Sequence, residues 1–168
     1  MIKINVITNN KNWYRFLRRP DDYIDQKLKI LNSKEKIFLK KNFFCTLLLS
    51  NDKEIKDLNN KFRKKNKTTD VLSFPFQTKQ DLRRYFKEKK EIYLGDIIIN
   101  LNKIKSKKNI SEFKVEFDKL WVHGLIHLFG HDHKKKKDFL EMSLIEKKYM
   151  NLINCLLYTS PSPRDKRQ

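Results

Sequence analysis

The sequence predicts an α/β (α+β) protein with a single mixed sheet packed by helices. Short segments with alternating or continuous apolar residues, typical of strands, are separated by longer segments with apolar residues at helical intervals. The length of 168 residues suits one hydrophobic core of ordinary size. The sequence contains no internal repeat, and we expect one domain over residues 1–153.

The N-terminal third is expected to form a strand, a helix and a second strand. Residues 2–8 alternate apolar and polar side chains, as a half-buried strand does, and residues 43–49 form a short, continuously apolar strand. Residues 21–41 carry apolar side chains spaced as on one face of a helix. These side chains are Ile24, Leu28, Leu31, Ile37 and Phe38.

The middle of the chain is expected to add a helix and two strands. Asn51 to Glu54 resembles a capping box that opens a helix. Strands follow at residues 71–74, closed by Pro75, and at residues 96–99. The highly charged residues 77–91 between these strands are typical of a solvated surface loop, with a partly helical segment as the alternative. The side chains expected to be buried on the helix are Ile55, Leu58 and Phe62.

Two helices and a tail complete the chain. One helix is expected over residues 115–129, and a last helix opens at Asp138 and continues to Ile153. Residues 154–168 change composition and contain two of the four prolines. We expect this segment to be a disordered tail or foreign sequence that resembles adapter or vector read-through. The core-facing side chains expected on the first helix are Leu120, Trp121, Leu125 and Leu128.

The four histidines of the chain all lie between His123 and His133. Imidazole is the commonest protein ligand for borderline metals such as zinc. His123 and His127 are four residues apart, so on a helix they lie on one face, about 6 Å apart along the axis, and can reach one ion. The clustering therefore predicts a metal site.

The third ligand is expected to follow a turn. On a continued helix, His131 would stand about 12 Å along the axis from His123, which is too far for bonds of about 2.1 Å. Gly130 can end the helix in the left-handed conformation. Either His131 or His133 can then return to the ion, and we favour His133, with Asp132 orienting a ligand or capping the turn.

The spacing H-x-x-x-H-x-x-G-x-x-H also occurs in metzincin proteases. In those enzymes a glutamate follows the first histidine and removes the proton from the attacking water. Here that position is Gly124, so a reaction other than ordinary zinc-protease hydrolysis is indicated. A zinc peptidase would need another carboxylate as its base, and Asp132 is the candidate in this chain.

The segment from His123 to His133 resembles the H-G-x-L-H-L-x-G-aromatic-D-H signature of the YbeY family, bacterial metal-dependent endoribonucleases of ribosomal RNA maturation. Ile126 replaces the first leucine after the glycine, and His131 stands where the family usually has an aromatic residue. Two further blocks agree in the family's order, residues 58–63 continuing through 69–76, and residues 94–99. The resemblance covers roughly residues 1–153.

The resemblance implies a YbeY-like fold and a single-strand-specific, metal-dependent endoribonuclease in small-subunit rRNA 3′-end maturation and ribosome quality control. Arg63 matches the family's functional arginine, so Arg63 and His127 are the catalytic candidates, while His123, His127 and His133 are the metal ligands. We expect one Zn²⁺ per chain, or another divalent transition metal. The implied partners are rRNA and the small ribosomal subunit. The rival interpretation is a non-catalytic ribosome-assembly factor with a structural metal.

Composition agrees with these expectations without proving them. The formal charge of +19 suits a polyanionic partner, although lysine also accumulates on solvated surfaces without a role. No apolar run approaches the ~20 residues of a membrane span, and residues 1–12 contain no apolar signal segment. With only Cys45 and Cys155 present, we expect no disulfide, no membrane association and a cytoplasmic location.

Overall fold

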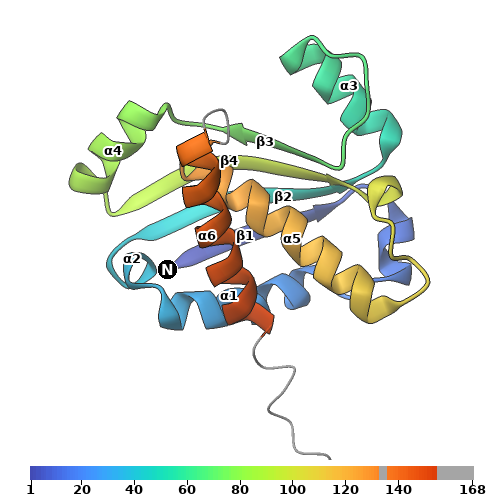
Figure 1. The fold of residues 1–168 in the computed structure, drawn as a ribbon, viewed down its shortest axis with the longest axis horizontal. Helices are drawn as coiled ribbons and strands as arrows, with labels where there is room; N and C mark the ends of the chain where they lie inside the picture. Colours follow the sequence, from blue (N-terminus) through green and yellow to red (C-terminus); the bar gives the residue numbers. More distant parts are fainter. Residues whose placement is uncertain (133–135, 155–168) are drawn as a thin grey trace, which may run out of the picture.

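The computed structural model describes residues 1–132 and 136–154, which form one four-stranded mixed sheet packed by helices (Figure 1). In sheet order the strands are β1 (Ile2–Thr8), β2 (Asn42–Ser50), β4 (Glu91–Asn100) and β3 (Val71–Pro75). The first three run parallel, and β3 pairs antiparallel with β4 at the edge of the sheet. The predicted fold class is confirmed.

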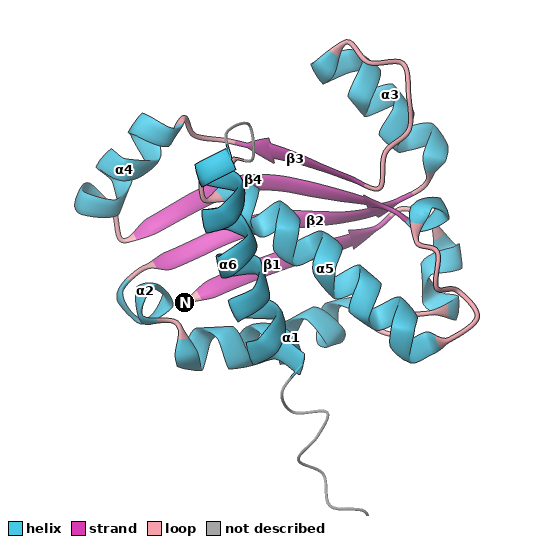
Figure 2. Cartoon of the chain, viewed as in Figure 1, coloured by secondary structure: helices cyan, strands magenta, loops and turns pink. Residues whose placement is uncertain are grey.

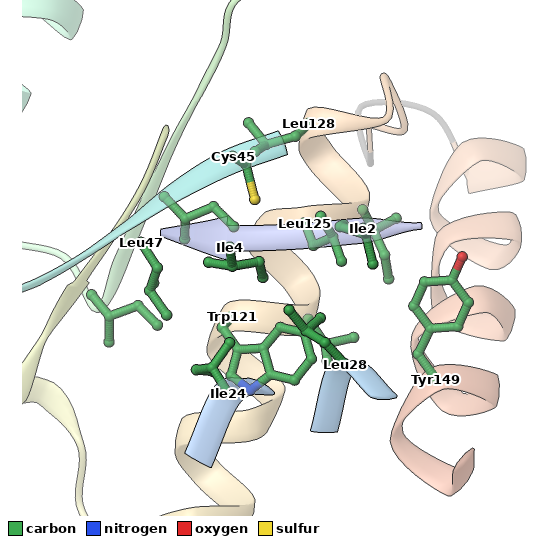
Figure 3. Packing of buried hydrophobic residues seen from close by; sticks show 14 of the residues in the cluster. Ile2, Ile4, Ile24, Leu28, Cys45, Leu47, Trp121, Leu125, Leu128 and Tyr149 are labelled. Atoms are coloured by element: carbon green, nitrogen blue, oxygen red, sulfur yellow. The ribbon is translucent and has the colours of Figure 1, made fainter. Parts of the chain in front are cut away.

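Three helices lie over one face of the sheet (Figure 2). They are α1 (Pro20–Lys34), α5 (Ile110–Leu128) and α6 (Lys136–Asn154). Helix α5 packs against β3 and β4, α1 packs against β1, and α6 packs against both helices. The main core between these helices and the sheet contains Trp121 and Leu125 of α5 together with Ile2 and Ile4 of β1 (Figure 3).

Helix α3 (Asp52–Arg63) lies on the opposite face. Side chains of successive strand residues point to opposite faces of a sheet. Ile97 belongs to the main core, whereas Ile98 packs with Ile55 of α3 in a separate small cluster. Helices α5 and α3 therefore cover opposite faces of β4.

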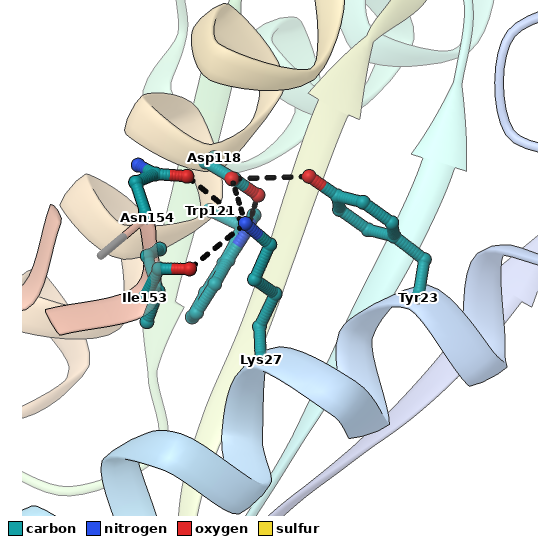
Figure 4. A network of polar contacts seen from close by, with 6 residues as sticks. All are labelled: Tyr23, Lys27, Asp118, Trp121, Ile153 and Asn154. Carbon is teal, nitrogen blue, oxygen red and sulfur yellow. Dashed lines mark hydrogen bonds and ion pairs between the residues drawn. The ribbon is translucent and has the colours of Figure 1, made fainter. Parts of the chain in front are cut away.

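A buried ion pair joins the three helices of the main layer (Figure 4). Asp118 of α5 lies 3.1 Å from the Lys27 Nζ of α1 and accepts hydrogen bonds from Tyr23 and Trp121. Lys27 also donates to the Ile153 carbonyl oxygen of α6 at 3.0 Å. Burial raises the pKa of Asp118, although the Lys27 charge and these hydrogen bonds act in the opposite direction. The pair ties the C-terminal helix to the rest of the fold.

Two sequence-based expectations about helices are wrong. Residues 21–41 form two helices, because Glu35 adopts an extended conformation between α1 and α2 (Lys36–Lys40) and pairs with Lys148 of α6. Residues 77–91 form no simple surface loop and match the alternative of a partly helical segment, because they contain α4 (Lys79–Glu88), whose Leu82 is buried in the main core. One apolar residue at the right place is enough to anchor this otherwise polar helix.

A third expectation, that α3 buries Phe62, is also wrong, because this side chain is 58% exposed. Helix α3 contacts the sheet through Ile55 and, less completely, Leu58, while its last turn extends past the edge of β3 (Figure 1). Short 3-10 helices at Lys11–Arg15 and Leu101–Lys103 complete the elements. No helix in the described part of the chain is both long and apolar enough to cross a bilayer.

Candidate active site

Helix α5 places His123 and His127 side by side. The Asn109 side chain caps its first turn by accepting hydrogen bonds from the backbone of residues 111 and 112. The apolar face of the helix, including Trp121 and Leu125, is buried in the core. This burial fixes the helix, so that the two imidazoles emerge together one turn apart on the partly exposed side.

The two imidazoles face each other through their Nε2 atoms, which are 3.1 Å apart. The Nδ1 of His127 lies 2.9 Å from the carbonyl oxygen of His131, which can only accept a hydrogen bond. The neutral His127 ring therefore carries its proton on Nδ1 and presents a lone pair at Nε2. The Nδ1 of His123 lies 3.5 Å from a carboxylate oxygen of Glu146 in α6, which favours the same tautomer.

A glycine turn creates the contact with the His131 carbonyl. Gly130 has a φ of +83°, and its N–H donates to the His127 carbonyl oxygen. This conformation ends α5 as predicted and brings the next residue back over the helix end. The His131 imidazole turns toward α6, where its Nδ1 lies 3.8 Å from Glu141.

The histidine pair fits the chemistry of a zinc site. Two ligands on one tetrahedral zinc ion, each bonded at about 2.1 Å, have their nitrogen atoms about 3.4 Å apart, close to the 3.1 Å found here. Each ring also has an acceptor at its other nitrogen, as is usual for metal-binding histidines. Within residues 1–132 and 136–154, no three His, Cys, Asp or Glu side chains form a metal-binding group. The predicted third ligand, His133, lies outside these residues.

Gly124 occupies a position where a side chain would clash with the sheet. A Cβ atom there would lie 2.6 Å from Cγ2 of Ile97 in β4 and 3.2 Å from Oγ of Ser73 in β3. The absence of a glutamate after the first histidine therefore has a structural reason, since α5 directly contacts the sheet at this point. This packing argues against a zinc peptidase of the ordinary kind.

Arg63 lies at the other side of the same cleft. It is the last residue of α3, and Lys64 ends the helix in the left-handed conformation with a φ of 57°. The Arg63 Nη2 donates to the carbonyl oxygen of Ser73 at 3.0 Å, and its guanidinium lies 5.7 Å from the centre of the Phe74 ring. The guanidinium therefore lies against β3, and only part of its five N–H donors is used by the Ser73 carbonyl oxygen.

The cleft between α5, β3 and the end of α3 has a volume of about 1010 Å³ and contains Arg63, His123 and His127. Sequence reasoning placed these three residues in one site, and the structure brings them together. Sequence reasoning did not find Lys79 or Glu146, because they come from α4 and α6, whose packing the sequence does not display. It also missed Lys119, although this residue precedes His123 by one turn of α5 and the helical spacing could have indicated it. The charged side chains that line the cleft are Arg63, Lys65, Lys79, Lys119, Asp70, Asp132 and Glu146.

Comparisons with known proteins identify the family of this chain. Residues 7–154 match the family model described as Endoribonuclease YbeY. The chain belongs to this family. An Endoribonuclease YbeY from Pelagibacter ubique is 46% identical over 144 residues, covering 84% of this chain and 90% of that protein. One from Ehrlichia canis is 32% identical over 153 residues, covering 90% of this chain and 92% of its own.

The fold is also that of a solved structure. The solution structure of a Thermotoga maritima protein aligns with a TM-score of 0.59 and 24% identity, covering 98% of this chain and all of the other. The segments that resemble the YbeY signature are distant in sequence and meet in this fold. The end of α3, strand β3 and the end of α5 line the cleft. Strand β4 pairs with β3, and α5 packs on both strands.

Proposed function

We propose that this chain is a metal-dependent endoribonuclease that cleaves single-stranded RNA in rRNA processing and ribosome quality control. Its expected substrate region is the 3′ end of small-subunit rRNA, and the small ribosomal subunit is the expected partner. The observation that carries the proposal is the shared cleft of Arg63 with the His123–His127 pair. Membership of a family described as an endoribonuclease supports the reaction class.

His123, His127 and His133 would hold one Zn²⁺, or another divalent transition metal. When bound, such an ion withdraws charge from a phosphoryl oxygen and makes a nearby water acidic at neutral pH. The chain itself keeps His127 Nε2 available by holding the Nδ1 proton against the His131 carbonyl oxygen. Glu146 acts in the same way on His123. These contacts orient both rings before any ion binds.

Arg63 would bind the phosphate at the reacting bond. Its guanidinium keeps one nitrogen on the Ser73 carbonyl oxygen, which fixes the side chain, and the remaining donors can bind phosphate oxygens in a bidentate manner. Charge on these oxygens grows as the bond is broken, so the contact favours the transition state more than the ground state. Lys65, Lys79 and Lys119 would attract and align the flanking phosphates.

The test uses the full chain with small-subunit rRNA and with isolated small subunits, followed by mapping of the RNA ends. His127→Ala should abolish cleavage and reduce zinc content well below that of the wild-type chain, measured by mass spectrometry of the metal. Arg63→Ala should reduce cleavage about 10²- to 10³-fold with zinc content unchanged. Arg63→Lys should cleave little faster than Arg63→Ala, because a lysine cannot make the bidentate contact with phosphate.

Arg84→Ala is the matched control, since Arg84 is an exposed arginine of α4 that pairs with Asp81 outside the cleft. It should cleave as the wild type does. Equal cleavage by the wild type and His127→Ala would indicate a contaminating nuclease and refute the proposal. Binding to subunits with intact zinc and no cleavage by any protein would favour the rival role, a non-catalytic assembly factor.

A further inference from the structure

The sheet face opposite α5 carries side chains in three rows that cross the strands. Residues paired in register on neighbouring strands point to the same face. The first row is Lys3, Phe44 and Tyr93; the second is Asn5, Thr46, Asp96 and Phe74; the third is Ile7, Leu48, Ile98 and Leu72. Their neighbours in sequence, such as Phe43 and Leu47, are buried in the main core on the other face.

Helix α3 covers the third row and reaches only Phe74, at the β3 end of the second row. Ile55 packs with Leu72 and Ile98, and Leu58 lies at the margin of the same cluster. No other helix of the described chain packs in that cluster. Helices α1, α5 and α6 all lie on the opposite face of the sheet from α3 (Figure 2). The first row and the second row apart from Phe74 therefore form the part of this face that α3 leaves uncovered.

Aromatic rings concentrate on the uncovered rows. Phe76, which follows β3, is 68% exposed and lies 5.5 Å from the 37% exposed Tyr93, measured between ring centres. Phe62 of α3 lies 5.2 Å from Phe74. Together with Phe44 these rings form what we call the aromatic face: Phe44, Phe62, Phe74, Phe76 and Tyr93. Exposed aromatic rings in such a cluster are unusual on a protein surface unless they bind something.

The charges beside these rings are mixed, with an excess of cations. Lys61 Nζ lies 5.3 Å from the centre of the Phe62 ring, and the Arg63 guanidinium lies over Phe74. Lys3 opens the first row. Glu91 and Asp96 are carboxylates on the same face, and Asp96 accepts a hydrogen bond of 2.6 Å from the Tyr93 hydroxyl. Asp25 and Lys29 of α1 line a pocket together with the first row.

Strand β3 joins the aromatic face to the catalytic cleft. Ser73 lines the cleft, whereas the next residue, Phe74, points to the aromatic face. Arg63 touches both, through its hydrogen bond to the Ser73 carbonyl oxygen and its position over the Phe74 ring. Because β3 is the edge strand, a chain held in the cleft can pass over this edge directly onto the rings.

We propose that the aromatic face is a stacking surface for bases of single-stranded RNA that extends from the catalytic cleft. Adjacent rows are about 7 Å apart, roughly twice the stacked base spacing of 3.4 Å, so the bases would bind splayed apart. Aromatic rings beside cations bind any base through its ring face. Asp96 can accept a hydrogen bond from an exocyclic amino group of a base. The inference rests on the proposed function for its class of ligand.

Binding is tested separately from cleavage with a fluorescent 12-nucleotide oligoribonucleotide whose 2′-O-methyl groups resist hydrolysis. Phe76→Ala combined with Tyr93→Ala should weaken binding about 25-fold or more, at least fivefold for each lost ring. The salt dependence of binding should keep its slope, since phosphate contacts are unchanged. An oligonucleotide carrying 5-iodouridine should crosslink to peptides that contain Phe74, Phe76 or Tyr93.

Tyr14→Ala with Phe139→Ala is the matched control, because both rings are exposed and lie outside the aromatic face. The control should bind as the wild type does. The fluorescence of the two buried tryptophans, Trp13 and Trp121, verifies that each variant is folded.

Full affinity in the Phe76→Ala, Tyr93→Ala variant would overturn the stacking surface while leaving the nuclease proposal intact. If that variant instead lost only its binding to small ribosomal subunits, the aromatic face would be a protein-docking surface, and the inference would be wrong. No binding of any oligoribonucleotide by the wild-type chain, together with no cleavage of rRNA, would overturn both proposals.

Discussion

The contact of Gly124 with β4 predicts a measurable coupling between Gly124 and Ile97. An alanine Cβ at residue 124 would stand 2.6 Å from Cγ2 and 3.2 Å from Cγ1 of Ile97, whereas ordinary carbon contacts are about 3.5–4.0 Å. Helix α5 would have to move away from β4 by about 1 Å. Alanine favours the helix by about 1 kcal/mol, while such overpacking costs about 1–3 kcal/mol. Gly124→Ala should therefore lower the free energy of unfolding by up to about 2 kcal/mol.

The double variant separates this clash from other effects. Ile97 is fully buried, so Ile97→Ala alone should cost about 2–5 kcal/mol by leaving a cavity. In Gly124→Ala with Ile97→Ala, the new methyl group enters that cavity and both clashing carbons are gone. The pair should be more stable than the sum of the single variants by about 1–3 kcal/mol. Urea unfolding followed by tryptophan fluorescence measures all three differences.

A control pair uses the neighbouring residue on the opposite face. Ile98 packs against α3 and not against α5, so Gly124→Ala and Ile98→Ala should be additive. Additive behaviour of the Gly124 and Ile97 pair, within about 0.5 kcal/mol, would refute the packing argument. The absence of a glutamate beside His123 would then need another explanation.

Three further predictions concern single side chains. Asp118→Asn should lower the free energy of unfolding by about 3 kcal/mol in urea titrations, because it leaves Lys27 buried without its anion. Hydrogen bonds from the side chains of Asn100 and Asn102 lower the pKa of Asp52 below 3.8, so its stabilisation is present above that pH and is lost as the pH falls through the lowered pKa. Asp52→Asn should therefore flatten the loss of stability as the pH falls below 3.8, and an unchanged acid limb would contradict this. Gly130→Ala should cost about 1–2 kcal/mol in thermal unfolding from its φ of +83°, and zinc content should fall with it; a neutral substitution would show that the turn is not strained.

Local patterns in the sequence predicted the elements that depend on burial of one face. The alternation of residues 2–8 matches β1, and the apolar run 43–49 lies within β2. The pattern failed where a single tertiary contact decided the outcome. Glu35 breaks a helical periodicity in favour of an ion pair with Lys148, and Leu82 anchors a helix in a segment whose charge is typical of a loop.

The site shows the same division between local and tertiary information. The spacing of His123 and His127 and the glycine that ends their helix are local features, and both were predictable. The partner of His123 was not, because Glu146 lies on a different helix and reaches the site only through the packing of α6 on α5. Resemblance to a family identified Arg63, but its exposed position followed from the way the last turn of α3 extends past the sheet.

The position of the last turn of α3 beyond the sheet explains why Phe62 is exposed. It also explains why Arg63 contacts both the catalytic cleft and the aromatic face. Helix α3 is anchored near its start by Ile55, and the left-handed Lys64 stops it directly after Arg63. The arginine therefore stands at the open edge of β3, where the Ser73 carbonyl oxygen faces outward to receive it. A helix packed against the sheet along its full length would cover Phe74. The last turn of α3 extends past the sheet instead, and this leaves the catalytic cleft and the aromatic face connected across β3.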